Sequence, residues 1–91
     1  MNKTELIQKV AIETGLNRSQ ASLAVDNILV SIQQALQNGG NVQLIGFGTF
    51  EVRERAAREG RNPSTGESLT IPARKVPAFK AGKLLKEMVN N

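Results

Sequence analysis

The stretch that decides the fold of this chain runs from Arg53 to Lys75 and reads RERAAREGRNPSTGESLTIPARK. At its centre, the segment from Gly60 to Gly66 combines two glycines, an asparagine and a proline, which are residues that tight turns favour. The flanking residues suit extended strands but are too polar to be buried. The pattern predicts a charged β-ribbon that reverses at its centre, with Pro63 at the second position of the turn, and that projects from a folded body.

The return limb of this ribbon contains a second informative proline. Residues 68–71, SLTI, alternate polar and apolar side chains, as a half-exposed strand does. Pro72 follows and has no N–H to donate to a neighbouring strand. It therefore predicts an edge strand or a β-bulge at this point.

The positive charge of the chain is concentrated around the ribbon. The formal net charge is +4 and the isoelectric point is about 10.0. Residues 52–86 hold nine basic and three acidic side chains, whereas the remainder holds three basic and five acidic ones. This distribution indicates a polyanionic partner, and nucleic acid is the commonest such partner.

Length and composition limit the classes of protein to which this chain can belong. A chain of 91 residues forms one small domain, and Phe47, Phe50 and Phe79 are its only aromatic residues. A core with so few large rings buries little area, which favours an obligate dimer. Cysteine is absent, so disulfides and thiolate chemistry are excluded. No apolar run is long enough to span a bilayer, so we expect a cytoplasmic location and no membrane partner.

The N-terminal part has the pattern of two capped helices. Asn2 and Glu5 fit a capping box, and Gly15 is a typical residue for ending the first helix. Asn17 and Gln20 repeat the capping arrangement for a second helix, which the Asn-Gly-Gly at 38–40 ends. The apolar face of the second helix consists of Ala21, Ala24, Val25, Ile28, Leu29, Ile32, Ala35 and Leu36.

Two helices joined by a short turn also fit a helix-turn-helix reader of DNA. Such a reader needs polar and basic side chains along its second helix. Residues 18–37 contain one arginine and one aspartate and no other charged residue. We therefore interpret the helices as scaffold and dimer core, with a helix-turn-helix regulator as an alternative.

A sheet and a last helix follow. Val42 and Leu44 alternate with a polar residue and predict a strand that leads into Phe47 and Phe50, which we expect to be core residues. The C-terminal segment predicts a short helix. Its basic stripe consists of Lys80, Lys83 and Lys86.

Nothing in the sequence indicates catalysis. The chain has no histidine, and Asp26 is its only aspartate. The glycines at 60 and 66 lack the strand-to-helix context and the Gly-Lys-Ser of a phosphate-binding loop. We therefore expect no enzymatic activity, no cofactor, no metal site and no small-molecule substrate.

Several motifs carry a resemblance to a known family. They are GFGTF at 46–50, RERAAR at 53–58, GRNP at 60–63 followed by Thr65 and Gly66, VPAFKAGK at 76–83, and the start MNKTELI. Together they resemble the bacterial histone-like, DNA-bending proteins, the family of HU and integration host factor. The match runs from end to end of the chain.

The resemblance implies an α+β fold in which two chains form an intertwined dimer. Each chain has an N-terminal helical pair, a three-stranded antiparallel sheet extended into a β-ribbon arm, and a short C-terminal helix. A single domain of residues 1–91 would divide into a helical dimerisation body at 1–40, a sheet at 41–80 with the arm at about 53–75, and a helix at 81–91.

The resemblance also implies roles for individual residues. Pro63 would be the wedge that intercalates between base pairs in the minor groove. The DNA contacts would be Lys3, Arg53, Arg55, Arg58, Arg61, Asn62, Pro63, Arg74, Lys75, Lys80, Lys83 and Lys86. The dimer core would contain Phe47, Phe50, Phe79, Ile28, Leu29, Ile32, Leu36 and Leu44.

The implied function is bending and compaction of double-stranded DNA in the bacterial nucleoid, without sequence specificity. A sequence-specific bending factor of the integration host factor type is the alternative within the family. The alternative from another class is a non-DNA interaction module that binds RNA or an anionic membrane. Phosphate contacts barely distinguish RNA from DNA. The resemblance leaves open whether the dimer is a homodimer or a heterodimer with a paralogue.

Overall fold

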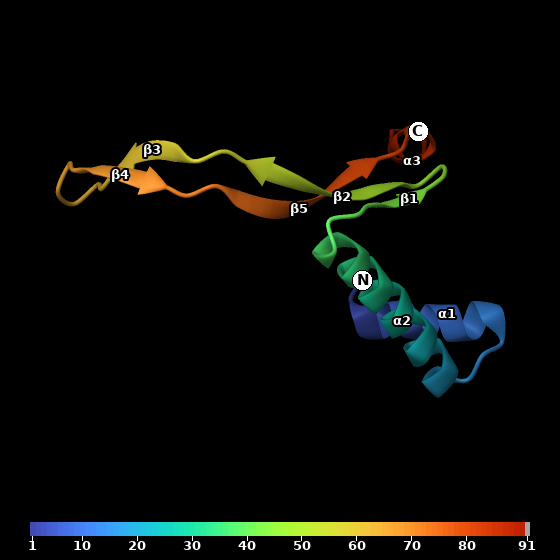
Figure 1. The fold of residues 1–91 in the computed structure, drawn as a ribbon. Helices are drawn as coiled ribbons and strands as arrows, with labels where there is room; N and C mark the ends of the chain where they lie inside the picture. Colours follow the sequence, from blue (N-terminus) through green and yellow to red (C-terminus); the bar gives the residue numbers. More distant parts are fainter. Residues whose placement is uncertain (91) are drawn as a thin grey trace. The chain divides into compact units, whose positions relative to one another are not determined.

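The computed structural model describes residues 1–90 and divides the chain into two compact units, Met1–Ala35 and a second unit that begins at Leu36. The elements within this range, labelled in Figure 1, are α1 (Lys3–Thr14), α2 (Arg18–Gln37), β1 (Val42–Leu44), β2 (Gly48–Arg55), β3 (Arg58–Arg61), β4 (Ser68–Ile71), β5 (Arg74–Ala81) and α3 (Lys83–Val89). Helices and antiparallel strands are segregated along the chain, so the predicted α+β class is confirmed.

Helices α1 and α2 begin and end at the residues that the capping patterns predict. The Asn2 side chain accepts a hydrogen bond of 2.9 Å from the Glu5 N–H, and Gly15 ends α1 with φ of 75°. At the start of α2, the Asn17 and Gln20 side chains each accept a hydrogen bond from the other residue's backbone N–H, at 2.8 and 3.1 Å. These bonds satisfy N–H groups that have no partner within the helix.

The buried core of the helical pair is small. Its buried residues are Ile7, Ala21 and Val25, with Val10 and Ala11 packed against them. Most of the apolar face of α2 is not covered within one chain, since Ile28 is 59% exposed and Leu29 is 41% exposed. So large an uncovered apolar surface is typical of a chain that associates with a partner. Within residues 1–90, no helix has the length and apolarity that a membrane crossing requires.

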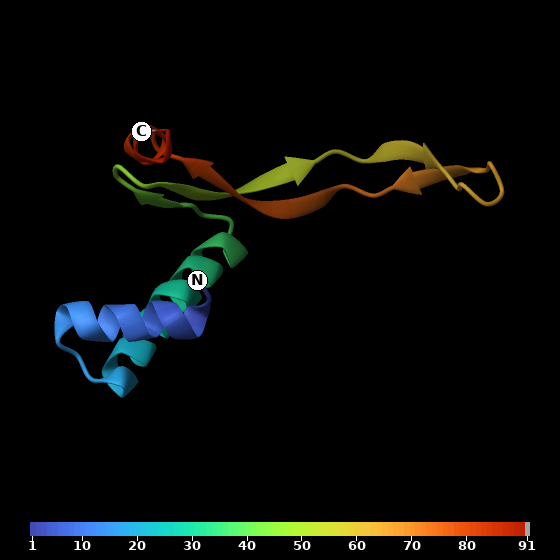
Figure 2. The same cartoon turned by 180° about the vertical axis from the view of Figure 1, so that it is seen from behind.

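The second unit contains a three-stranded antiparallel sheet with the order β1-β2-β5. β1 and β2 form a hairpin in which Val42 lies opposite Phe50, and the turn is closed by a 2.9 Å hydrogen bond from the Phe47 N–H to the Leu44 carbonyl. β2 then pairs with β5 along its whole length, from Gly48 to Arg55. Figure 2, which views the molecule from behind, shows these two strands side by side.

Phe79 of β5 is the centre of an aromatic cluster. Its ring centroid lies 5.4 Å from that of Phe47 and 4.8 Å from that of Phe50. However, Phe47 is 47% exposed and Phe50 is half-buried, so these predicted core residues are not fully buried within a single chain. The reason is that the second unit has one sheet layer and one seven-residue helix, α3, with which to cover them.

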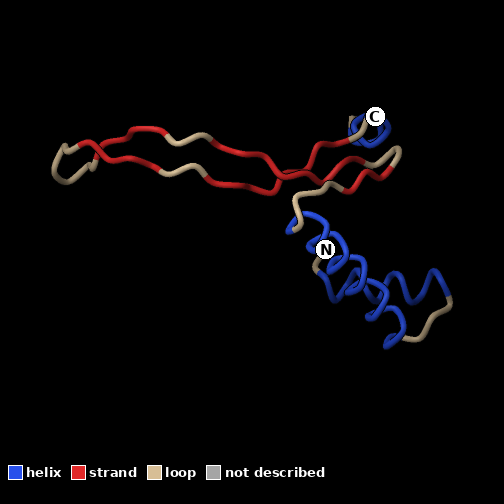
Figure 3. The backbone as a smooth tube through the Cα atoms, viewed as in Figure 1, coloured by secondary structure: helices blue, strands red, loops and turns tan. Residues whose placement is uncertain are grey.

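The ribbon continues beyond the sheet as a second ladder, in which β3 pairs with β4 from Arg58↔Ile71 to Arg61↔Ser68. Two residues on each limb, 56–57 and 72–73, separate the two ladders. Figure 3 shows these breaks in tan, opposite each other. Because the breaks are equal in length, the register is unchanged across them. Pro72 therefore interrupts the pairing without the inserted residue of a bulge.

The last helix is shorter than the predicted segment 81–91. Ala81 still pairs with Gly48 in the sheet, and Gly82 is the N-cap of α3. The Gly82 N–H donates to the Phe47 carbonyl at 2.8 Å, which joins the start of α3 to the β1–β2 turn. Residue 91 lies outside the described residues.

Candidate nucleic-acid interface

The tip of the arm is a loop organised by Asn62. The Asn62 N–H donates to the Glu67 carbonyl at 2.8 Å, and the Asn62 carbonyl accepts from the Gly66 N–H at 2.7 Å. The Asn62 Oδ1 accepts a third hydrogen bond, of 2.9 Å, from the Ser64 N–H. Pro63 is the second residue of this turn and is exposed. The local hydrogen bonds therefore hold the loop in a conformation that presents the proline to solvent.

A glycine is required where the tip returns to β4. Gly66 has φ of 74°, and an added Cβ would meet no atom within 4 Å. The requirement is therefore conformational and not steric, since L-residues with a side chain rarely adopt the left-handed region. The sequence prediction of a glycine-closed turn around Pro63 agrees with this geometry.

The predicted cationic contacts of the arm are exposed and come from both of its limbs. They are Arg53 and Arg55 on β2, Arg58 and Arg61 on β3, and Arg74 and Lys75 on β5. A charged group that is half or more exposed keeps its hydration at little cost and remains available to a large anion. The outgoing limb thus presents cations from the sheet to the tip, whereas the cations of the return limb lie only at the start of β5, next to the sheet.

Two of these cations have acidic neighbours. The Arg53 Nη2 lies 3.0 Å from the Glu51 Oε1, because residues two apart on a strand lie on the same face. Lys75 is the cross-strand partner of Glu54. In contrast, no salt bridge within residues 1–90 involves Arg55 or Arg74, which are each other's cross-strand partners.

The three predicted lysine contacts near the C-terminus are brought together. Lys80, Lys83 and Lys86 line an open hollow of about 400 Å³ beside Thr49 and Gly82. The prediction that all three lie on the last helix is wrong for Lys80, which belongs to β5 because the ladder with β2 extends as far as Ala81. The lysines nevertheless form one basic surface, which strand and helix build together.

Lys3 lies in the other unit and already has a partner. Its Nζ is 2.6 Å from the Asp26 Oδ1, and the side chains are 57% and 46% exposed. The pair joins the first turn of α1 to the middle of α2. A phosphate that contacts Lys3 must therefore compete with this carboxylate.

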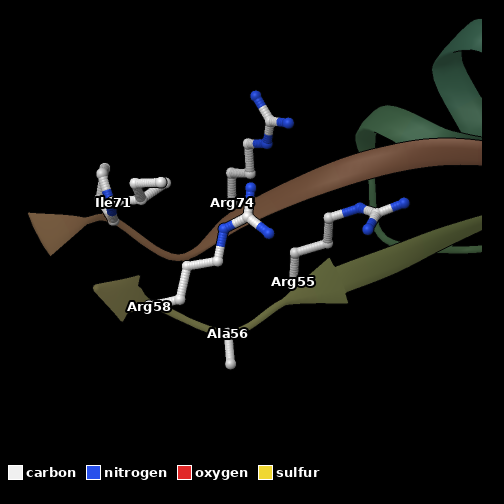
Figure 4. Close-up of a pocket in the computed structure, with 6 residues that line it drawn as sticks. Arg55, Ala56, Arg58, Ile71 and Arg74 are labelled. Atoms are coloured by element: carbon white, nitrogen blue, oxygen red, sulfur yellow. The ribbon is translucent and has the colours of Figure 1, made fainter. Parts of the chain in front are cut away.

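Sequence reasoning missed two features of the surface. It named Lys3 as a contact without its partner Asp26, and no periodic signal links them because they lie on different helices. No sequence pattern groups Arg55, Arg58 and Arg74, although the structure places them around one hollow where the ladders break (Figure 4). Within residues 1–90, no cluster of three or more histidine, cysteine, aspartate or glutamate residues is arranged to hold a metal ion.

The fold and the surface define a class: a small basic α+β protein with a cationic two-stranded arm. The family model described as "Bacterial DNA-binding protein" matches residues 1–90, and the chain belongs to this family. It is 64% identical to DNA-binding protein HU of Geobacillus stearothermophilus over 89 residues, covering 98% of this chain and 99% of the relative. It is 62% identical to DNA-binding protein HU of Staphylococcus aureus, with the same coverage of both chains.

Solved structures give the same result. HU from Anabaena, in a cocrystal with DNA, has a TM-score of 0.90 and 50% sequence identity, covering 98% of this chain and 97% of that one. HU from Thermotoga maritima has a TM-score of 0.71 and 39% identity, covering 98% of each chain. The family and fold expected from the motifs are therefore confirmed.

Proposed function

We propose that this chain acts as a dimeric architectural protein that binds duplex DNA with little sequence preference and bends it. Each arm enters the minor groove, and Pro63 inserts between base pairs. The relatives named as DNA-binding proteins, and the Anabaena HU–DNA cocrystal, support DNA as the partner. The same relationship supports a location on the bacterial nucleoid and a binding role in place of catalysis.

The observation that carries this proposal is the geometry of the tip. Pro63 is exposed at the end of a cationic ribbon, in a loop whose polar groups are already bonded to one another through Asn62. Proline presents a rigid apolar face and has no N–H that would be left without a partner between base pairs. In known minor-groove architectural proteins, HU among them, such apolar wedges kink the duplex, and the bend brings more phosphates within reach of the protein.

The cations of the arm favour affinity without specificity. They are arginines and a lysine distributed along an exposed ribbon, as contacts to phosphates are. The minor groove offers a degenerate pattern of donors and acceptors, so binding there depends mainly on groove shape and on how easily the duplex deforms. We infer a preference for flexible or already kinked DNA over any particular sequence.

The apolar surface supports a dimer of this chain. Ile28 and Leu29 on α2, Phe47 in the β1–β2 turn and Phe79 on β5 are each at least 40% exposed in one chain. Ile32, Leu36 and Phe50 are half-buried, and Leu44 is 41% exposed. These residues form the proposed dimer core. A second copy of the chain that covers them would bury the surface that the three-residue core of the helical pair leaves open.

The decisive experiment measures bending and affinity separately. In Pro63→Ala, the bend angle of a doubly labelled duplex, measured by single-molecule fluorescence energy transfer, should fall, while the dissociation constant should rise by less than about tenfold, since the phosphate contacts remain. Ser64→Ala is the matched control, because the tip uses the Ser64 backbone N–H and not its hydroxyl. An unchanged bend angle in Pro63→Ala would refute the wedge.

A further inference from the structure

The connection between α2 and β1 contains the one Asn-Gly pair of the chain, Asn38-Gly39. α2 ends at Gln37, so Asn38 is the first residue beyond the helix, and it is exposed. Gly39 has φ of 81°, and its N–H donates to the Leu36 carbonyl at 3.0 Å. Helices commonly end in this way, with a left-handed glycine after the last turn. The amide side chain of Asn38 therefore precedes a glycine in an exposed turn.

An asparagine in such a turn can react with its own backbone. The Gly39 nitrogen, after losing its proton, attacks the side-chain carbonyl carbon of Asn38, and the side-chain nitrogen takes up a proton and leaves as ammonia. Water then opens the resulting succinimide ring, which yields aspartate or, through the other carbonyl, isoaspartate. The conversion consumes one water molecule and releases one ammonia molecule. It requires no enzyme, oxidant or cofactor.

The absence of a side chain at Gly39 makes the attack sterically possible. The side chain of a following residue lies beside its own nitrogen and hinders the approach of the carbonyl carbon. Around Gly39, no atom lies within 4 Å of the place that a Cβ would occupy. The remaining restraint is the hydrogen bond from the Gly39 N–H to Leu36, which must open first. Because helix ends fray, this bond is among the first of the helix to open.

The other asparagines of the helices and the arm lack this combination. The side-chain oxygens of Asn2 and Asn17 accept capping hydrogen bonds of 2.9 and 2.8 Å. Asn27 lies within α2, where regular backbone hydrogen bonds hold the next nitrogen. Asn41 precedes a β-branched valine, and Asn62 precedes a proline, whose nitrogen has no proton to lose. Asparagine is a thermolabile residue in general, but the geometry restricts this reactivity to Asn38.

We infer that Asn38 is a site of spontaneous deamidation, which places a negative charge at the C-terminal end of α2. That end carries the negative pole of the helix dipole, and no basic residue in the last turn of α2 offsets the new charge. Each event also lowers the formal net charge of the chain from +4 by one unit. Isoaspartate, in addition, lengthens the main chain between α2 and β1 by one methylene group. The end of α2 is thus weakened as the protein ages.

The test incubates the full-length protein at mildly acidic and at mildly alkaline pH and follows the reaction by mass spectrometry. Trypsin releases residues 19–53 as a single peptide, because this range has no lysine or arginine before Arg53. Fragmentation of the peptide separates Asn38 from Asn27 and Asn41. We expect the mass gain of an amide-to-acid conversion at Asn38 alone, and faster at alkaline pH, because the attacking nitrogen must lose its proton. An equal gain at Asn41, or a rate independent of pH, would overturn the site.

Gly39→Ala tests the role of the missing side chain. The added Cβ should slow the conversion of Asn38 at least about tenfold, which corresponds to about 1.4 kcal/mol of activation free energy. The left-handed backbone strains an alanine, which promotes opening of the turn and would speed the reaction. A slower reaction in this variant can therefore come only from the Cβ. Gly40→Ala leaves the attacking nitrogen unchanged and should react at the wild-type rate. An unchanged rate in Gly39→Ala contradicts the inference.

Asn38→Asp reproduces the charge of the product on an unaltered main chain. It should lower the melting temperature by about 3 °C, because a carboxylate at the C-terminal end of a helix is unfavourable. Asn41→Asp is the matched control, since it adds the same charge beyond the helix, and it should lower the melting temperature by less than half as much. Equal losses in the two variants would overturn the effect on α2. Neither measurement depends on DNA, so the result is independent of the proposed function.

Discussion

The ammonium of Lys3 on α1 lies 2.6 Å from the carboxylate Oδ1 of Asp26 on α2. This oxygen is shielded from water and accepts no other hydrogen bond from the described residues. Lys3 is also one of the residues that we expect to contact DNA phosphates. If Lys3 does contact a phosphate, one ammonium would serve either the internal carboxylate or the external phosphate, and DNA binding would be coupled to this ion pair between the helices.

Removing the carboxylate should release Lys3 for DNA. We expect Asp26→Asn to raise the affinity for a duplex by about threefold at low salt, because a half-exposed ion pair is worth at most about 1 kcal/mol. The slope of log affinity against log salt should steepen by about one unit, as one further phosphate is neutralised. Fluorescence anisotropy at four salt concentrations measures both quantities.

Glu13→Gln is the matched control for this variant. It makes the same change of charge and breaks the exposed pair of Lys9 and Glu13, which is 3.5 Å long and includes no expected DNA contact. An equal gain in affinity in both variants would mean that net charge, and not the release of Lys3, is responsible.

Each arm arginine should contribute to DNA affinity to a similar extent whatever the sequence of the duplex. Arg58→Ala and Arg61→Ala should each weaken binding to several unrelated duplexes by similar factors and reduce the salt slope by about one unit. Binding titrations on three duplexes of different composition test this. A large loss on one duplex alone would instead favour a sequence-specific reader of the integration host factor type.

The stability of the protein should depend on its concentration. If the exposed apolar residues Ile28 and Phe47 are buried only in a dimer, unfolding is coupled to dissociation. A tenfold rise in concentration then adds about 1.4 kcal/mol per dimer and raises the melting temperature by about 4 °C. Thermal unfolding followed by circular dichroism over a hundredfold range of concentration gives the answer, and a constant midpoint contradicts the proposed dimer.

Gly48 should tolerate no side chain. An alanine Cβ there would lie 2.5 Å from the Phe79 Cζ and 2.6 Å from the Lys80 carbonyl oxygen, and the backbone oxygen cannot move without disrupting the sheet. We expect Gly48→Ala to lower the free energy of unfolding by about 3 kcal/mol. Gly39→Ala is the control, since its Cβ meets nothing within 4 Å and its cost is only the left-handed backbone, about 1 kcal/mol. Chemical denaturation measures the free energy of unfolding of both variants, and an equal loss in the two would refute the steric explanation.

Local features of the chain were predictable because their causes lie within a few residues. The capping box of Asn17 and Gln20 and the turn at Asn62 depend on hydrogen bonds between residues at most five positions apart. The start of α3 was less predictable. β5 extends to Ala81 because Gly48, which is distant in sequence, pairs with it. Lys80 therefore belongs to the sheet, whereas the sequence pattern predicted that it would lie on the helix.

The sequence by itself determined the capped helices, the ribbon with its glycine-closed proline tip, the concentration of positive charge in residues 52–86 and, through its motifs, the family. Only the tertiary structure decided which charges meet: Lys3 with Asp26, and Arg55 with Arg58 and Arg74 around the break in the arm. The physical reason is distance along the chain. Caps and turns form between neighbours, whereas the register of two strands and the packing of two helices bring together residues whose separation in sequence carries no periodic signal.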